Sequence, residues 1–399
     1  MAQAQHEDAS AAIISVVGTL WPGATVELTR GRRRSPTADA EFIVMPHARS
    51  PRLLVPSSPP SAAARSMLRF SAAISPGETA SRVAVAAALR LGSTAAFADR
   101  IRIAGGDPSL ADHLGRLLGE PVTFSLGIGT ARVNRKPVLQ VFDQRGRTLA
   151  FAKIGDSPVS RADIAEEVTA LRQLTDVSWR RLQIPRVLHY GDWGDHSVLL
   201  LSALPTRPQL PGRRAGRPPV DAMRELSETF AGPTMPLREL PWLAHHRQIA
   251  DRLADPETGR RFRTCLDQTV ALVGDHTITT GAWHGDWTPW NMARGAGLIR
   301  LWDFERFETG VPTGLDHAHY TVNATTRSHG TSPDTIRAGL ALAGALPDDP
   351  GSAPHRRGAL YLLAALSRYL PQTEVAGGEH IAHRAQQFLT TLETWLGSR

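Results

Sequence analysis

The 399-residue sequence has a single cysteine, Cys265, which excludes a disulfide bond within the chain. Chains without disulfides are typical of the reducing cytoplasm, and we expect a cytoplasmic location. No apolar run reaches the roughly 18 residues that a membrane-spanning helix needs. Residues 1–8 lack the basic segment that opens a secretory signal. The sequence therefore predicts neither a membrane protein nor a secreted one.

Lysine is almost absent as well. Only two of the 45 Lys and Arg residues are lysines, Lys136 and Lys153, so the net charge of +7 comes from arginine. The arginine clusters are short, and abundant Arg together with Ala, Gly and Pro is typical of a GC-rich genome. A nucleic-acid groove needs a longer basic stripe. We therefore expect solvated arginines and no nucleic-acid partner.

An apolar content of 42% predicts a packed core, and the length favours two or three domains at about 150 residues each. Residues 1–108 form an N-terminal region without obvious chemistry. Strand candidates lie there at residues 41–45 and 52–55. Residues 80–102 are Ala-rich and predict one or two helices.

After residue 108 the sequence indicates strands and helices more clearly. Residues 109–204 predict a small antiparallel sheet with one helix. The expected strands are 122–126, 132–142, 148–154, 186–190 and 197–201, and the expected helix is 163–174. Residues 205–399 begin with a Pro- and Arg-rich linker and then predict mainly helices.

The most informative motif is H-G-D-x-x-x-x-N at residues 284–291, followed by W-D-F-E at residues 302–305. Phosphoryl transfer needs one carboxylate that orients and deprotonates a hydroxyl, and it needs carboxylate and amide oxygens that hold Mg²⁺. Asp286 fits the first role, and Asn291 and Asp303 fit the second. Each residue alone is more often a loop or strand-end residue, but the combination favours the chemistry. Glu305 is either a third carboxylate near the metal or a solvated residue.

Lys153 lies inside the apolar segment at residues 149–154, although the chain almost never uses lysine. A buried ammonium needs partners, and nucleotide phosphates together with a helix carboxylate would supply them. Glu167 is the preferred partner and Glu166 the alternative, because the two point about 100° apart on a helix. The simpler alternative is a lysine that extends from an edge strand to water.

Gly127-Ile128-Gly129-Thr130 lies between two expected strands. Glycines there would let backbone N–H groups approach phosphates, but G-x-G alone is a weak signal, and a plain hairpin turn is the better explanation of it.

Together these motifs resemble the aminoglycoside phosphotransferase/choline kinase family, within the protein-kinase-like fold, over about residues 109–396. The resemblance implies an α+β, bilobal architecture. Its parts would be a small antiparallel-sheet N-lobe at residues 109–204 and a mostly helical C-lobe at residues 205–399 with the acceptor pocket. Residues 1–108 would be an extra N-terminal α/β region of unknown role.

The same resemblance implies the roles of individual residues. Asp286 would be the catalytic base, Asn291 and Asp303 the Mg²⁺ ligands, and Lys153 the phosphate-binding lysine positioned by Glu167. The other expected ATP-binding residues are Gly127, Gly129, Thr130, Ser202, Ala203 and Leu204. Asp316 would be a buried brace of the catalytic loop, and we expect the same of His284.

The resemblance implies an ATP- and Mg²⁺-dependent kinase that phosphorylates a hydroxyl of a small molecule, such as an aminoglycoside, an amino alcohol or a sugar-like compound. Thr288 and Trp290 depart from the family's usual loop, which leaves the acceptor open.

Two alternatives to this function stay open. One is a kinase-fold binding module without catalysis. The other is a metal-dependent hydrolase, in which the metal would be held by residues of the motif and of the segment after it. Its candidate ligands are His284, Asp286, Asp316, His317 and His319.

Overall fold

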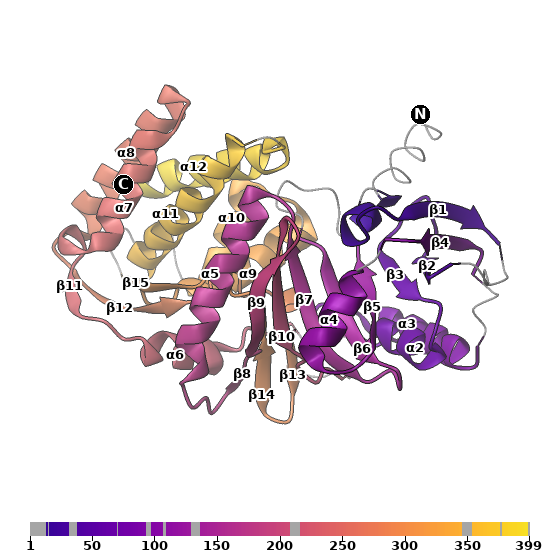
Figure 1. Cartoon of the computed structure of the whole chain (residues 1–399). Helices are drawn as coiled ribbons and strands as arrows, with labels where there is room; N and C mark the ends of the chain where they lie inside the picture. Colours follow the sequence, from indigo (N-terminus) through magenta and orange to yellow (C-terminus); the bar gives the residue numbers. More distant parts are fainter. Residues whose placement is uncertain are drawn as a thin grey trace. The chain divides into compact units, whose positions relative to one another are not determined.

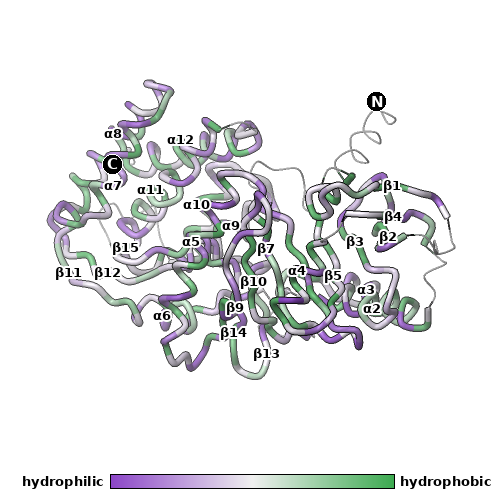
Figure 2. The backbone as a smooth tube through the Cα atoms, viewed as in Figure 1, coloured by the Kyte–Doolittle hydropathy of each residue, from purple (hydrophilic) through white to green (hydrophobic). Residues whose placement is uncertain are grey.

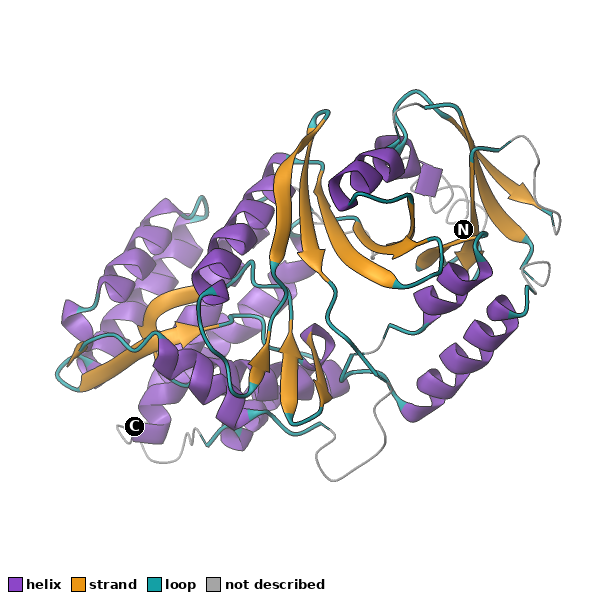
Figure 3. Ribbon diagram, turned by 60° about the horizontal axis from the view of Figure 1, so that its bottom comes forward, coloured by secondary structure: helices purple, strands orange, loops and turns teal. Residues whose placement is uncertain are grey.

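The chain forms two compact units in a computed structural model that describes residues 13–14, 16–31, 38–69, 71–92, 97–106, 109–128, 136–207, 216–344, 353–375 and 377–397. The first, the sheet unit, comprises Met1–Val177, Ile184–Gly212 and Ala293–Gly295. The second, the helical unit, comprises Ser178–Gln183, Arg213–Met292 and Ala296–Arg399. Figure 3 shows the contrast between strand-rich and helix-rich parts. The three-part division into residues 1–108, 109–204 and 205–399 stays a prediction.

A nine-stranded sheet organises the described residues of the sheet unit (Figure 1). Its strand pairs are antiparallel, and its spatial order is β1-β4-β2-β3-β5-β6-β7-β10-β9. The strands are β1 Thr25–Arg30, β2 Ala40–Met45, β3 Leu53–Pro56, β4 Asp99–Ala104, β5 Val122–Gly127, β6 Val138–Asp143, β7 Thr148–Gly155, β9 Val187–Trp193 and β10 His196–Ser202. The helices are α2 Pro60–Met67, α3 Pro76–Arg90, α4 Leu110–Leu118 and α5 Pro158–Thr175.

The N-terminal region continues this sheet. β3 pairs with β5 at Leu53↔Gly127, which joins β1–β4 to β5, β6, β7, β10 and β9.

One expectation for the N-terminal region is wrong, because residues 99–102 belong to β4 rather than to a helix. Ile101 of β4 enters the apolar core, whereas Arg100 is buried against Glu41, with Nη1 2.5 Å from Oε1. The Ala-rich helical pattern therefore ends before residue 99, and residues 99–102 follow the alternation of a strand.

Side-chain alternation in β7 decides where Lys153 points. Ala152 and Ile154 share one core cluster with Leu110 and Leu114 of α4. Successive residues of a strand face opposite sides of the sheet, so Lys153 faces the other side. There α5 packs against β7 and β10.

The helical unit packs around α11. Its helices are α6 Val220–Thr229, α7 Pro241–Arg252, α8 Pro256–Val273, α9 Leu315–His329, α10 Pro333–Leu342, α11 Ala353–Thr373 and α12 Glu379–Gly397, and its short 3₁₀ helices are η2 Leu237–Glu239 and η3 Pro289–Asn291. α11 is buried without interruption from Gly358 to Ser367 and packs against α7, α8, α9 and α12. Figure 2 shows hydrophobic colour along α11 and along inner strands of the large sheet. No helix in the described part of the chain has the length and apolarity to cross a bilayer.

Short strands flank the motif residues. They are β8 Leu182–Gln183, β11 Thr234–Pro236, β12 Thr277–Trp283, β13 Met292–Gly295, β14 Leu298–Leu301 and β15 Glu308–Pro312. β12 pairs with β11 and β15, and β14 pairs in parallel with β8. The H-G-D motif thus begins where β12 ends, and Asp303 follows β14.

Candidate active site

Gly285 sets the backbone of the loop that follows β12. Its φ of +78° lies in the left-handed region, which favours glycine. A Cβ at this position would also collide with the Arg368 guanidinium and with the carbonyl oxygen of Arg306. Arg368 Nη1 donates to the carbonyl oxygen of Gly285 over 2.8 Å. The glycine of the motif is therefore required by both conformation and packing.

Asp316, near the start of α9, braces this loop. Its Oδ2 accepts the backbone N–H of His284 over 2.8 Å, and its Oδ1 accepts that of Gly285 over 3.1 Å. Burial raises the pKa of Asp316 to about 7, and the two backbone N–H donors oppose that rise. These contacts agree with the bracing position that the resemblance implied.

His284 is fully buried, and both of its ring nitrogens are used within the protein. Nδ1 accepts the backbone N–H of Asp286 over 3.2 Å. Nε2 lies 3.1 Å from the carbonyl oxygen of Trp302 and must donate to it. Burial lowers the pKa of His284 to about 4, so the ring is neutral near pH 7. The residue fastens the loop and keeps no lone pair for a metal.

Both carboxylate oxygens of Asp286 are oriented by neighbours. His319 Nε2 lies 3.2 Å from Oδ1, and Asn291 Nδ2 donates to Oδ2 over 2.8 Å. Asn291 Nδ2 also donates to the backbone carbonyl oxygen of Asp286 over 3.0 Å. The Asp286 side chain keeps 36% of its surface exposed. It is therefore held in one geometry and remains accessible.

Trp302 links the segment that carries Asp303 to the same loop. Its backbone N–H donates to the carbonyl oxygen of Asn291 over 3.1 Å, and its own carbonyl oxygen accepts from His284. Asp303 has a φ of +76°, a strained value for a residue with a side chain. Such strain persists where the surroundings hold the backbone in place, and here two hydrogen bonds of the preceding residue do so.

In the sheet unit, Lys153 pairs with the preferred of its two candidate carboxylates. Lys153 Nζ lies 2.5 Å from Glu167 Oε2, and the Glu167 side chain is fully buried. Glu166 is exposed and is not the partner in this ion pair. One turn earlier on α5, Asp163 Oδ2 lies 3.1 Å from the Nζ of Lys136, the other lysine of the chain. Both side-chain amines are thus held by one helix.

The expected nucleotide-binding segments are only partly described. Gly127 ends β5, whereas Gly129 and Thr130 lie outside the described residues. At the end of β10, the backbone N–H of Ser202 donates to the carbonyl oxygen of Arg186, and its Oγ accepts the backbone N–H of Arg186. Ala203 and Leu204 follow, and both are partly buried.

The metal-cluster alternative gains no support from the geometry. Within the described residues, no three His, Cys, Asp or Glu side chains are arranged to hold a metal ion. His284 has no free ring nitrogen, and His319 directs one nitrogen to Asp286. His317 is partly buried, and burial lowers its pKa.

Sequence reasoning misses the role of His319 as a hydrogen-bond partner of Asp286. Behind it, the hydroxyl of Tyr361 lies 3.5 Å from His319 Nδ1. The only local signal is the spacing of His319 three residues after Asp316, which puts both on one face of a helix. Arg368 and Tyr361 of α11 give no signal at all, because their positions depend on the packing of α11 against the loop.

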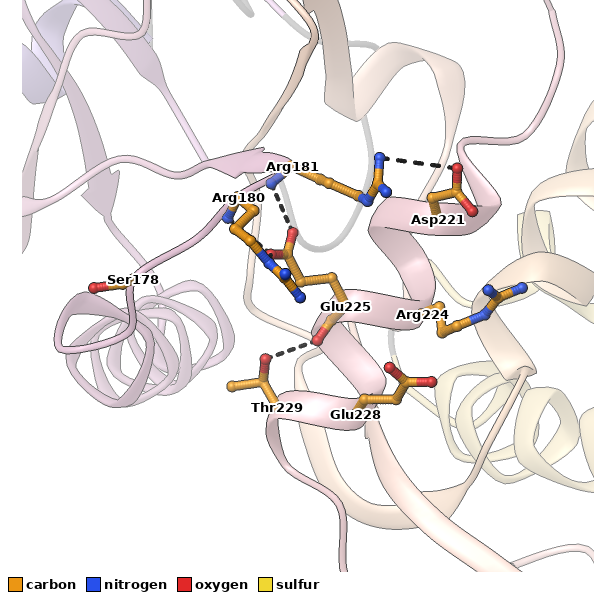
Figure 4. Close-up of a pocket in the computed structure, with 8 residues that line it drawn as sticks. All are labelled: Ser178, Arg180, Arg181, Asp221, Arg224, Glu225, Glu228 and Thr229. Atoms are coloured by element: carbon orange, nitrogen blue, oxygen red, sulfur yellow. Dashed lines mark hydrogen bonds and ion pairs between the residues drawn. The ribbon is translucent and has the colours of Figure 1, made fainter.

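A polar cavity of about 400 Å³ beside α6 is a poorer candidate (Figure 4). Glu225 accepts the backbone N–H groups of Arg180 and Arg181, each over 2.8 Å. Asp221 Oδ2 lies 3.9 Å from Arg181 Nη1. Glu225 and Asp221 of α6 thus contact residues 180–181, and we interpret the cavity as a junction between residues 178–183 and α6.

Known structures share the fold of this chain. No model of a known protein family matches the chain, and no curated protein matches it. An asparagine-to-alanine variant of a thermostable mutant of aminoglycoside phosphotransferase APH(4)-Ia, in a ternary complex with AMP-PNP and hygromycin B, is 15% identical with a TM-score of 0.52. The match covers 73% of this chain and 100% of that one. A second such variant in the same type of complex is 15% identical with a TM-score of 0.51, over 73% and 99% of the two chains.

These likenesses concern the fold. The chain has the bilobal, protein-kinase-like α+β fold of the aminoglycoside phosphotransferases, as the motifs predicted. The sheet is larger than expected. Strands of the N-terminal region extend it to nine strands within the described residues.

Proposed function

We propose that this chain is an ATP- and Mg²⁺-dependent phosphotransferase that moves the γ-phosphoryl group to a hydroxyl of a small molecule. The observation that carries the proposal is the arrangement around Asp286. Its carboxylate is oriented by His319 and Asn291, stands on a braced loop, and stays accessible. A general base of phosphoryl transfer requires these properties.

In the proposed reaction the acceptor hydroxyl oxygen forms a bond to the γ-phosphorus while the bond from that phosphorus to the β,γ-bridging oxygen breaks. ADP leaves with the bridging oxygen, and the hydroxyl proton passes to Asp286. His319 and Asn291 both present N–H groups to the Asp286 carboxylate, so they hold it and leave its other lone pairs to the hydroxyl. Positioning and charge stabilisation supply most of the rate enhancement in such reactions.

Asn291 and Asp303 fit a divalent cation. The Asn291 amide nitrogen faces Asp286, which leaves its side-chain oxygen for another partner. Asp303 supplies a carboxylate, and Mg²⁺ prefers few protein oxygens together with phosphate oxygens and water. When bound, the cation would neutralise charge on the β- and γ-phosphates. Glu305 is partly buried and is not required in this assignment.

Lys153 is assigned to the α- and β-phosphates. Its ion pair with Glu167 keeps the ammonium charged and directed although it is buried, because an isolated ammonium would lose its hydration without compensation.

The rest of the nucleotide is assigned to backbone groups of the sheet unit. The segment of Gly127, Gly129 and Thr130 would bind phosphates, and the segment of residues 202–204 would bind adenine. The N–H of Ser202 is already engaged, which favours Ala203 and Leu204 as donors.

A cytoplasmic location would give the enzyme access to ATP and is part of the proposal. The partner is a small-molecule hydroxyl compound rather than a nucleic acid or a membrane. The hydrolase alternative is not favoured, since His284 is committed to the loop.

The decisive experiment replaces Asp286 by Asn. ADP release from Mg·ATP is measured with aminoglycosides, amino alcohols and sugars, and nucleotide binding is measured by calorimetry. We expect Asp286→Asn to lower transfer by about 10² to 10⁴ while nucleotide binding is retained.

Asp267→Asn is the matched control, because this carboxylate is 74% exposed on α8. Transfer by Asp286→Asn at the parental rate would show that the base is misassigned. A parent that binds ATP but never releases ADP would favour the binding module, and bound zinc or manganese with activity independent of ATP would favour the hydrolase.

A further inference from the structure

One face of α9 lies beside Asp286 and carries basic and amide groups. His319, Asn323 and Arg327 follow one another at intervals of four residues, which stacks them on one side of the helix. His319 contacts the Asp286 carboxylate, and Asn323 Nδ2 donates to the backbone carbonyl oxygen of His319 over 2.8 Å. We call these three residues the α9 strip.

Arg384 of α12 joins the α9 strip at its centre. Its Nη2 donates to Asn323 Oδ1 over 2.8 Å, and its guanidinium carbon lies 5.2 Å from the ring centroids of both Tyr369 and Phe388. It is close enough to Asp286 to interact with that carboxylate electrostatically. Among the described residues, no carboxylate lies within ion-pair distance of Arg384. The groups that it contacts are neutral, although the residue is partly buried.

The catalytic loop extends the same surface. Arg327 lies over the ring of Trp290, with 4.7 Å between the guanidinium carbon and the ring centroid. Trp290 stands between Asp286 and Asn291 in the sequence. A second guanidinium and an aromatic ring therefore stand beside the loop of the proposed base.

Most carboxylates of the surrounding helices have protein partners, whereas Glu379 at the start of α12 is exposed. Asp316 accepts two backbone N–H groups, and Glu374 accepts the backbone N–H of Ala254. Asp334 pairs with Arg337 and Glu393 with Arg261. A polycationic acceptor would need free carboxylates and would meet the charges of Arg384 and Arg327 instead.

We propose that the acceptor is a hydroxyl compound that carries a carboxylate or phosphate group, and that Arg384 binds this anion. The inference rests on the proposed function and adds the class of its acceptor. Guanidinium groups bind carboxylates and phosphates through two parallel hydrogen bonds, and such charged bonds are the strong ones. The anion would give Arg384 a countercharge in direct contact, which its described protein neighbours do not provide.

The test uses acceptors that share a sugar ring but differ in charge. Glucuronate and glucose 6-phosphate are anionic, glucose is neutral, and glucosamine and kanamycin are cationic. ADP release from Mg·ATP is measured with the full chain for each compound. We expect the anionic sugars to have higher kcat/KM than glucose, and the cationic ones lower.

Arg384→Gln should raise the KM for the anionic sugars about 10- to 100-fold, the loss expected when a charged hydrogen bond is removed. Arg384→Lys keeps the charge but not the planar pair of donors and should recover part of the loss. Arg247→Gln, which changes a half-exposed side chain of α7, is the matched control.

Preference for glucosamine or kanamycin, or an anion preference that persists in Arg384→Gln, would overturn the acceptor class and leave the proposed function standing. Equal ADP release by the parent and by Asp286→Asn with every sugar would overturn both.

Discussion

His319 shows how one side chain can control a carboxylate. Its Nε2 reaches Asp286 Oδ1, and Tyr361 lies behind its Nδ1. Burial lowers the pKa of His319, so the ring stays neutral and acts as a fixed N–H donor. We infer that His319 positions Asp286 and does not itself carry the transferred proton.

Removal of this donor should therefore affect turnover more than binding. We expect His319→Leu to lower kcat about 10-fold with little change in the KM for ATP, by the loss of one hydrogen bond of about 1–2 kcal/mol.

His319→Gln retains an N–H donor near the Nε2 position and should recover most of the activity. The measurement is steady-state ADP release at several ATP concentrations, which separates kcat from KM. An unchanged kcat in His319→Leu would contradict the positioning role.

At the scale of elements, the helix α9, which carries Asp316 and His319, is held closely by α10. Gly339 of α10 faces the backbone of Val322, and a Cβ at Gly339 would lie 2.5 Å from Val322 Cα. Backbone atoms cannot yield as a flexible side chain can. The two helices would have to separate, which would disturb the support of His319 and Asp316.

We expect Gly339→Ala to lower the free energy of unfolding by about 1–3 kcal/mol, the usual cost of overpacking. Urea denaturation would measure it. Gly397→Ala is the control, because a Cβ there meets open space. Equal stability of the two variants would show that α9 and α10 can shift apart freely.

The elements that sequence reasoning finds share a strong local pattern. The apolar strand around Lys153 is β7, and the helix with Ile164, Val168 and Leu171 at helical spacing is α5. β4 escapes such reasoning because its buried Arg100 depends on Glu41, which lies 59 residues away. The pairing of β3 with β5 and that of β8 with β14 are also long-range. Local periodicity cannot reveal such partners.

The residues of the candidate site also fall into two groups, those that a local motif indicates and those that only the packing brings together. The H-G-D motif and the isolated Lys153 are visible because their residue types are unusual in their surroundings. His319, Tyr361 and Arg384 lie on helices whose sequence shows only an amphipathic pattern. These side chains lie near Asp286 because of how α9, α11 and α12 pack, and this packing cannot be read from local sequence patterns.

At the scale of the whole molecule, buried histidines determine the response to acid. Burial lowers the pKa of His246 to about 3 and that of His284 to about 4, against 6.5 for a free histidine. The unfolded chain therefore binds more protons than the folded one between these values, and stability falls as pH falls through this window. Asp316, with its pKa raised to about 7, acts in the opposite direction between pH 3.8 and 7. The two histidines outweigh it.

We expect the melting temperature to fall between pH 7 and pH 5. His246 alone should contribute about 2 kcal/mol of this loss by proton linkage. His246→Leu should flatten the dependence, whereas His245→Leu, at the adjacent exposed position, should not. Thermal denaturation across the pH range is the measurement. The same slope in both variants would contradict the assignment.

The scarcity of lysine has a practical consequence for chemical labelling. Both side-chain amines are nearly covered, with exposed fractions of 7% at Lys136 and 10% at Lys153, and both are bound to α5 carboxylates. An acylating ester should therefore find no freely exposed lysine on the folded chain. Under the proposed function, an acyl-phosphate analogue of ATP, which delivers its reactive carbon beside the phosphates, should react with Lys153. The extent of modification of Lys153 would then measure how much of the protein has bound nucleotide, with little labelling at other lysines.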